Sequence, residues 1–175
     1  MAIKSNRLYA SRGLTMDIPS VLRSWLYCES SLTDKLRMLT GDARLSIIRE
    51  GFEAVDALDY RSREIEMYSH GVACWYAKTM IQLPVYLIHD YLFHRLNTEP
   101  LGALLYDNPD IERTIMHIEP LFSHQWPYEL INASLTQGVQ PLWMRQSTFS
   151  IKKRDTFTLT EVFLPGLLRI IACDN

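Results

Sequence analysis

Apolar residues recur at helical spacing in three segments of the chain, which predicts helices over residues 19–28, 32–40 and 84–96. The first and third segments each have a proline near their start, where its missing amide hydrogen is tolerated. A further short helix is expected to begin at Pro127. The chain ends in a short tail, residues 166–175, that we expect to be peripheral. The predicted helices are therefore grouped mainly in two places.

Elsewhere apolar and polar residues alternate, which is typical of a strand with one buried face. The alternating runs cover residues 43–50, 61–68, 72–83, 111–119, 142–151 and 156–164. The turn residues Ser69, His70 and Gly71 join the second and third runs into a β-hairpin. Most connections are too short for the crossover that parallel strands need. The sequence therefore predicts an α+β fold with a single antiparallel sheet of about six strands.

Length and charge are those of an ordinary globular protein. The chain has 175 residues, and 18 Lys and Arg against 20 Asp and Glu give a formal net charge of −2. We expect one domain over residues 1–175, with residues 1–18 as a loose N-terminal arm. This charge offers no general attraction to nucleic acid, and no segment has the roughly 20 consecutive apolar residues of a membrane span. A monomer is expected, because no extra apolar stripe requires a partner.

Cysteines and histidines give no sign of a metal centre. The three cysteines, Cys28, Cys74 and Cys173, are widely spaced and form no zinc-binding pattern. His89 and His94 are five residues apart and do not share a helix face as a ligand pair would. Without an apolar secretory segment at the N-terminus, we expect a cytoplasmic protein with reduced thiols. The glycine-rich and nucleophile motifs of nucleotide-binding proteins and serine hydrolases are also absent.

Two charged residues of opposite sign share a strand face with apolar residues. Arg63 alternates in phase with Ile65 and Met67, and Glu161 with Leu159 and other apolar side chains. A buried charge needs a partner, because its removal from water is costly. One interpretation is a pocket for a polar, anionic ligand. The alternatives are a structural Arg–Glu pair, or a face that is exposed to solvent.

Arg49 and Arg145 raise the same question on their own strands. Arg49 is in phase with Ile47, and Arg145 with Trp143 and Phe149. Several inward-pointing arginines favour a ligand with carboxylate or phosphate groups, which a guanidinium holds through two parallel bonds. The alternative is that these arginines lie at the rim, with only their aliphatic stems packed.

Short segments in a fixed order resemble the chorismate lyase family. They are Trp25-Leu26 with Glu29-Ser30-Ser31-Leu32-Thr33, then Ile48-Arg49-Glu50-Gly51-Phe52, Arg63-Glu64-Ile65, Glu99-Pro100-Leu101-Gly102, Leu142-Trp143-Met144-Arg145-Gln146-Ser147 and Leu159-Thr160-Glu161-Val162-Phe163-Leu164-Pro165. The resemblance covers roughly residues 19–165. Each segment alone is weak, but together and in order they are specific.

The resemblance implies an enzyme that removes pyruvate from chorismate and leaves 4-hydroxybenzoate, the first step toward ubiquinone. It implies no metal or organic cofactor, and an antiparallel sheet with helices that form flaps over a closed internal site. The flaps would be residues 19–40 and 84–102.

The resemblance also assigns roles to individual residues. Arg63 would pair with the ring carboxylate and Glu161 with the 4-hydroxyl group, as the catalytic residues. Leu101 and Leu32 would bind substrate or product, partly through backbone atoms. Whether Glu161 also acts as a base is left open, because a largely unassisted elimination fits as well.

The sequence departs from the family pattern at Lys78, where arginine is common, and at Gln146. An alternative function is therefore a domain of the related fold that binds a small aromatic acid without turnover, as in some bacterial regulators. A diverged member that binds another aromatic acid is a third possibility. Chorismate turnover separates the first hypothesis from the other two.

Overall fold

A single antiparallel sheet forms the framework of the molecule in a computed structural model that describes residues 17–97, 99–106 and 108–173. The strands are β1 (Arg44–Val55), β2 (Leu58–Ser69), β3 (Val72–Gln82), β4 (Ile111–Leu121), β5 (Leu142–Ile151) and β6 (Asp155–Phe163). Within the described residues the sheet has six strands in the order β1-β2-β3-β6-β5-β4, and every neighbouring pair is antiparallel. The predicted α+β fold is confirmed. Most of the expected N-terminal arm, residues 1–16, lies outside the described residues.

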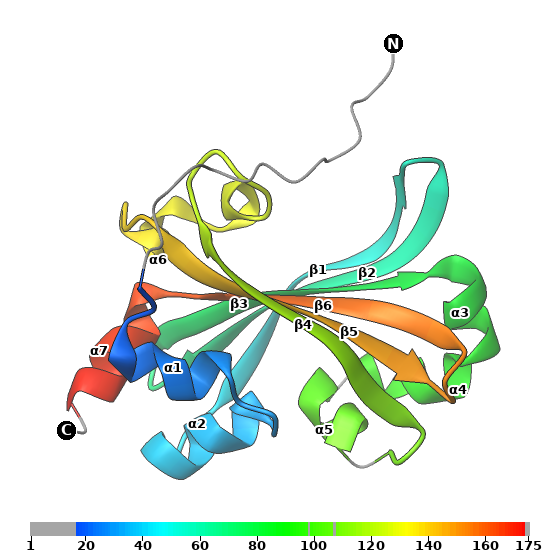
Figure 1. The fold of residues 1–175 in the computed structure, drawn as a ribbon, viewed down its shortest axis with the longest axis horizontal. Coiled ribbons are helices and arrows are strands. Elements are labelled where there is room, and N and C mark those ends of the chain that lie inside the picture. Colours follow the sequence, from blue (N-terminus) through cyan, green and yellow to red (C-terminus); the bar gives the residue numbers. More distant parts are fainter. Residues whose placement is uncertain (1–16, 98, 107, 174–175) are drawn as a thin grey trace.

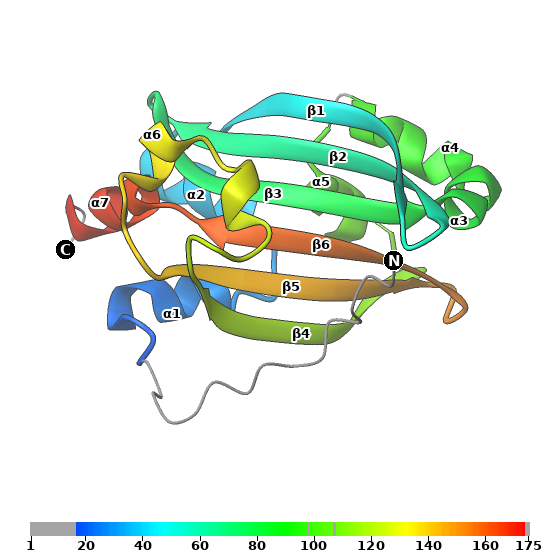
Figure 2. The same ribbon diagram turned by 90° about the horizontal axis from the view of Figure 1, so that it is seen from above.

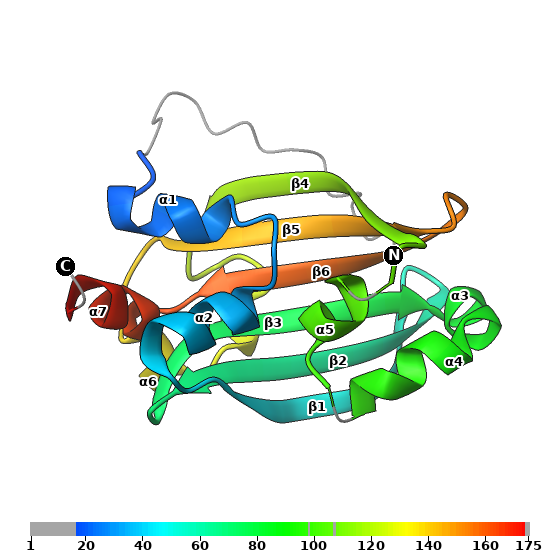
Figure 3. The same ribbon diagram turned by 90° about the horizontal axis from the view of Figure 1, so that it is seen from below.

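Most helices cover one face of this sheet (Figures 1 and 3). They are α1 (Ser20–Leu26), α2 (Leu32–Thr40), α3 (Leu83–Ile88), α4 (Asp90–Phe93), the 3-10 helix η1 (His94–Asn97), α5 (Leu101–Tyr106) and α7 (Pro165–Cys173). The segment between β4 and β5 crosses the opposite face (Figure 2) and contains the 3-10 helix η2 (Tyr128–Leu130) and α6 (Ala133–Thr136). Within the described residues, no helix is long and apolar enough to cross a membrane.

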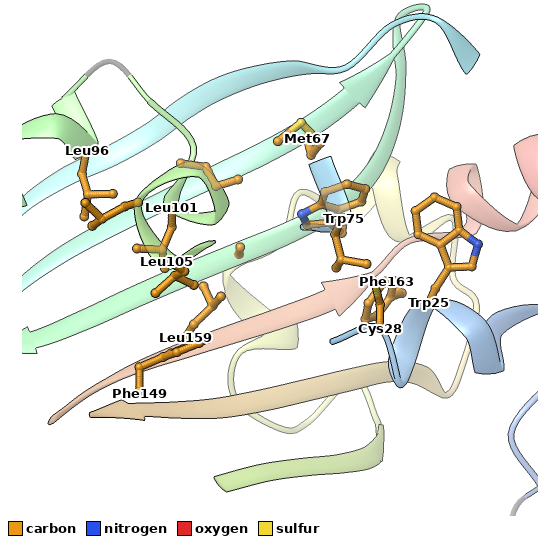
Figure 4. Close-up of a cluster of buried hydrophobic side chains, with 14 of the residues drawn as sticks. Trp25, Cys28, Met67, Trp75, Leu96, Leu101, Leu105, Phe149, Leu159 and Phe163 are labelled. Atoms are coloured by element: carbon orange, nitrogen blue, oxygen red, sulfur yellow. The ribbon is translucent and has the colours of Figure 1, made fainter. Parts of the chain in front are cut away.

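The main core lies between the sheet and its helical cover. It combines Trp25 of α1, Trp75 of β3, and Leu101 and Leu105 of α5 with Phe149 on β5 (Figure 4). A smaller cluster on the other face joins the η2 region to the sheet. The helices that cover the larger core are therefore anchored by burial of their apolar sides.

Local sequence explains where α2 begins and where the chain turns between β2 and β3. The Ser31 hydroxyl accepts a hydrogen bond from the amide of Asp34 at 3.1 Å, so Ser31 caps the N-terminus of α2. Between β2 and β3, His70 and Gly71 both have positive φ, at 48° and 78°. This is the backbone twist of the two-residue turn that suits antiparallel strands, and the prediction of a hairpin is confirmed.

A β-bulge in β1 reverses the prediction for Arg49. Ile47 pairs with Ile65, but Arg49 pairs with Glu64, and the register shifts between them. Because Glu64 and Ile65 are consecutive on β2, Ile47 and Arg49 lie on opposite faces. Arg49 is exposed and does not face the helices.

Two other segments differ from the predictions. The helix expected over 84–96 is broken at His89 into α3, α4 and η1. The tail expected over 166–175 is instead largely α7, in which Leu167 is fully buried. Pro165 forms the first residue of this helix, a position that proline suits, and the apolar residues after it pack on the core.

A substitution of Gly166 tests how closely α7 packs on the sheet. A Cβ at this position would overlap the carbonyl oxygen of Ala73 on β3. We expect Gly166→Ala to destabilise the protein by about 1–3 kcal/mol, measured by urea unfolding. The matched control is Gly51→Ala, where a Cβ meets no atom within 4 Å. Equal stability of the two variants would contradict this packing.

Candidate active site

A pocket lies between the inner face of the sheet and the helices that cover it. It contains about 540 Å³ not filled by atoms, part of which is open to solvent. The lining consists of Ser30, Ser31, Leu32, Thr33, Leu45, Arg63, Ile65, Met67, Trp75, Ala77, Thr79, Pro100, Leu101, Gly102, Leu105, Tyr106, Arg113, Arg145, Leu159 and Glu161. Apolar walls thus surround a few charged groups.

Two segments of the cover meet above the pocket. Residues 30–33 lead into α2, and residues 100–106 contain α5; both line the pocket. They are in contact, because a Cβ built on Gly102 would lie 3.0 Å from the hydroxyl of Ser31. Leu32 and Leu101 are the first residues of their helices, where amides have no partner within the helix. The structure therefore brings together Leu32, Leu101, Arg63 and Glu161, the residues to which the family resemblance assigned binding or catalysis.

Arg63 is buried without a carboxylate partner among the described residues. Its side chain is on the inner face of β2, and the residue is only 5% exposed. One terminal nitrogen donates to the carbonyl of Glu99 at 3.2 Å, while Nε and the second terminal nitrogen have no hydrogen-bond partner. The neighbouring Glu50 instead forms an ion pair with Arg61. Arg63 is therefore a cation with two donors free for a ligand.

Burial lowers the pKa of the Arg63 guanidinium from its ordinary value. An arginine nevertheless stays protonated in proteins, because its ordinary pKa is far above neutral pH. The guanidinium can therefore form a two-bonded contact with an anionic group such as a carboxylate.

Glu161 has a partner, and that partner is Arg145. The Nε and a terminal nitrogen of Arg145 lie 2.7 and 2.6 Å from the same oxygen, Oε2 of Glu161. The two residues are directly opposite each other on β5 and β6. In the described part of the chain no hydrogen bond reaches Oε1 of Glu161, so this oxygen can accept one from a ligand. Arg63 and Glu161 both line the pocket, but the ion pair that Glu161 forms is with Arg145 and not with Arg63.

The third nitrogen of Arg145 holds the helical cover. It donates to the carbonyls of Trp25, Leu26 and Cys28 at 3.4, 3.3 and 2.9 Å. These carbonyls lie at and after the C-terminal end of α1, where backbone acceptors lack partners within the helix. A cation at this end is also favoured by the helix dipole. Arg145 is fully buried, so every one of these contacts is shielded from water.

Sheet register sets the distance between the two charged ends. Arg63 pairs with Thr79, which pairs with Leu159, two residues before Glu161. Glu161 therefore lies two strands away from Arg63 and two residues further along the strand direction. This offset places the Cα atoms of the two residues roughly 12 Å apart. Arg63 and Glu161 thus line the pocket from two separate positions on the sheet.

Arg113 is a pocket residue that sequence reasoning did not single out. It lies on β4, whose register shifts between Arg113 and Ile115. The bulge puts Arg113 and Met116 on the same face, although simple alternation assigns them to opposite faces. Arg113 donates to the carbonyl of Cys28 at 3.2 Å and to the hydroxyl of Tyr106 at 3.3 Å.

Other candidates lie away from this pocket. Lys78, the departure from the family pattern, forms ion pairs with Glu53 and Glu64 at 2.8 and 3.3 Å. His89 is 2.8 Å from the carboxylate of Asp155. The described residues contain no cluster of three or more His, Cys, Asp or Glu side chains that could hold a metal ion.

Comparison with known proteins gives a consistent match through most of the chain. A sequence model of the family described as chorismate lyase matches residues 5–170. A probable chorismate pyruvate-lyase of Pseudoalteromonas translucida is 27% identical over 163 residues, which cover 87% of this chain and 89% of that protein. Another, of Nitrosomonas europaea, is 36% identical over 76 residues, 43% of this chain and 42% of that protein.

The similarity to a solved structure is weaker. The C-terminal domain of the histidine utilization repressor from Pseudomonas syringae covers 71% of this chain and 92% of its own, with a TM-score of 0.49 and 7% identity.

We expect substitutions of the two buried arginines, Arg145 and Arg63, to differ in their effect on the stability of the ligand-free protein. We expect Arg145→Met to destabilise the protein by about 3–5 kcal/mol, because it leaves the Glu161 carboxylate buried without its partner. Arg63→Met removes an unpaired buried charge and should leave the ligand-free protein as stable as the wild type, or more stable. Urea unfolding of both variants without ligand measures this difference. An equal loss of stability in the two variants would contradict the assignment of Arg145 as the structural cation and Arg63 as the free one.

Proposed function

Because the chain belongs to the chorismate lyase family, and is by that membership a lyase, we propose that it eliminates pyruvate from chorismate to give 4-hydroxybenzoate. The observation that supports this most directly is Arg63, a buried cation with two free donor nitrogens in a largely covered pocket. Such a group favours a ligand that brings its own carboxylate. Chorismate has a ring carboxylate at one end and a hydroxyl group at the other.

Chemically, the reaction needs positioning more than activation. The bond between C3 of the ring and the ether oxygen breaks, the hydrogen at C4 leaves, and the enolpyruvyl group takes up one hydrogen to become pyruvate. The ring becomes aromatic, which makes the step strongly downhill. The protein has to hold a flexible dianion in the reactive shape and exclude water, and segments 30–33 and 100–106 cover the pocket for this purpose.

Each charged residue has a role in this proposal. Arg63 binds the ring carboxylate and fixes the orientation of the ring. Oε1 of Glu161 accepts a hydrogen bond from the 4-hydroxyl, while its Oε2 remains bound to Arg145. The backbone amides of Leu32 and Leu101 supply further contacts from the cover. We assign Glu161 to holding the hydroxyl group, since the elimination can proceed without a separate base.

The proposal also includes expectations about cofactors, the fate of the product, location and oligomeric state. They are that no metal or organic cofactor takes part, that the product serves ubiquinone synthesis, and that the protein works in the cytoplasm as a monomer.

Turnover of chorismate tests the proposed function. Purified protein with chorismate and no added metal or cofactor should form 4-hydroxybenzoate and pyruvate in equal amounts. Arg63→Met should weaken 4-hydroxybenzoate binding at least 100-fold in calorimetry, because one carboxylate loses its charge partner. Arg49→Met, on the opposite face of the sheet, is the control and should bind as the wild type does. A folded protein that binds 4-hydroxybenzoate without any turnover would support a sensor-like binding domain in place of the enzyme.

Glu161→Gln tests the contact with the hydroxyl group. The amide is a weaker acceptor than the carboxylate, and we expect kcat to fall by about 10- to 100-fold, the worth of one hydrogen bond to a charged group. The control is Glu66→Gln, which changes another buried carboxylate that accepts from Tyr68 outside the pocket. Full activity of Glu161→Gln would remove Glu161 from the reaction.

A further inference from the structure

Chorismate has a second carboxylate, on its enolpyruvyl group, and the proposed function requires a place for it. The following inference rests on that function. The enolpyruvyl group is attached at C3, next to the C4 atom whose hydroxyl group meets Glu161. The second carboxylate therefore enters the Glu161 end of the pocket, far from Arg63. A carboxylate in a largely apolar, covered pocket needs a cation or several donors.

Arg145 is the nearest cation to Glu161, but each of its three nitrogens already has a protein partner. Two nitrogens bind Oε2 of Glu161, and the third donates to backbone carbonyls around Cys28. A two-bonded contact between Arg145 and a ligand carboxylate needs two nitrogens, so it would displace at least one of these buried contacts and weaken the pairing of Glu161 or the carbonyls. A different cation has to serve this position.

Arg113 is placed beside Arg145 on the next strand. Both guanidinium groups donate to the same carbonyl, that of Cys28, so they converge at one end of the pocket. Arg113 lines the pocket, and among the described residues no carboxylate lies within ion-pair distance of it. Its Nε is buried without a hydrogen-bond partner. Its present partners are neutral: a carbonyl, the Tyr106 hydroxyl and the Met116 sulfur.

Two neighbours fix how Arg113 presents its charge. The guanidinium lies over the ring of Phe149, 5.2 Å from its centre, which restrains the side chain through a cation–π contact. The Tyr106 hydroxyl accepts from Arg113 and keeps its own hydrogen free to donate. Burial raises the pKa of the Tyr106 phenol, so this hydrogen is retained at neutral pH. Arg113 and Tyr106 together offer several donors to one anion.

We propose that Arg113, assisted by the Tyr106 hydroxyl, binds the enolpyruvyl carboxylate of chorismate. The substrate is then held by two arginines at opposite ends of the pocket, Arg63 for the ring carboxylate and Arg113 for the side-chain carboxylate. The product 4-hydroxybenzoate carries only the first of these groups. Arg113 thus distinguishes substrate from product, which neither Arg63 nor Glu161 can do.

The test compares affinity for chorismate with affinity for 4-hydroxybenzoate. Arg113→Met removes the charge and keeps an unbranched side chain that can pack on Phe149. We expect KM for chorismate to rise about 10- to 100-fold, while the Kd of 4-hydroxybenzoate stays within about twofold of the wild type. Arg113→Lys should recover part of the loss, since it restores a charge without the two-bonded geometry. Arg63→Met should weaken both ligands.

Binding of 4-hydroxybenzoate also serves as the check that each variant is folded. Arg113→Gln, which can still donate to the Cys28 carbonyl, is the second variant if Arg113→Met does not fold. Unchanged KM for chorismate in these variants, or an equal loss of affinity for both ligands, overturns the proposal and leaves Arg113 a structural residue. If the wild-type protein itself forms no pyruvate from chorismate, the proposed function fails instead, and the two failures are distinct.

Discussion

The rest of the site depends on the contacts of one buried group, the Arg145 guanidinium. It ties the carboxylate of Glu161 on β6 to the carbonyls at the end of α1, so one buried group sets both the floor and the cover of the pocket. An ion pair in a dry interior is stable only when its remaining donors and acceptors are satisfied. Here the carbonyls that a short helix leaves unpaired satisfy the third nitrogen of Arg145. The position of segment 28–33 over the pocket follows from this contact together with the apolar packing of α1.

All three nitrogens of Arg145 have protein partners, whereas Arg63 at the other end of the pocket has nitrogens without any. Arg63 is on the same sheet face and is equally hidden from water, yet two of its nitrogens have no partner. Such a group lowers the stability of the ligand-free protein, and a carboxylate from outside removes that penalty. Natural proteins keep unfavourable arrangements of this kind at binding sites, where stability is given up for function. The contrast between Arg145 and Arg63 thus separates the structural cation from the ligand-binding one.

Strand alternation in the sequence placed Arg63, Arg145 and Glu161 on inner faces, because regular strands fix side-chain direction with a period of two. It could not show which arginine pairs with Glu161, since that depends on which strands are neighbours. It assigned Arg49 to the wrong face, because a β-bulge inserts one residue and reverses the alternation. It did not single out Arg113, although Arg113 alternates in phase with Ile111 and shares its face in the structure. The C-terminal tail was misjudged for another reason. Its apolar residues become a helix only because the sheet offers a surface for Leu167 to bury against.

The proposed arrangement also determines how the two products differ in their hold on the protein. Once the C3–O bond breaks, the carboxylate at Arg113 belongs to pyruvate, and the contacts at Arg63 and Glu161 belong to 4-hydroxybenzoate. Tyr106, beside Arg113, is 45% exposed, whereas Arg63 is 5% exposed. In this proposal pyruvate is held beside the exposed Tyr106, by groups that contact no part of the ring. The ring is held between two buried side chains, below segments 30–33 and 100–106. Binding energy from Arg113 thus contributes to holding the substrate without adding to the retention of the aromatic product.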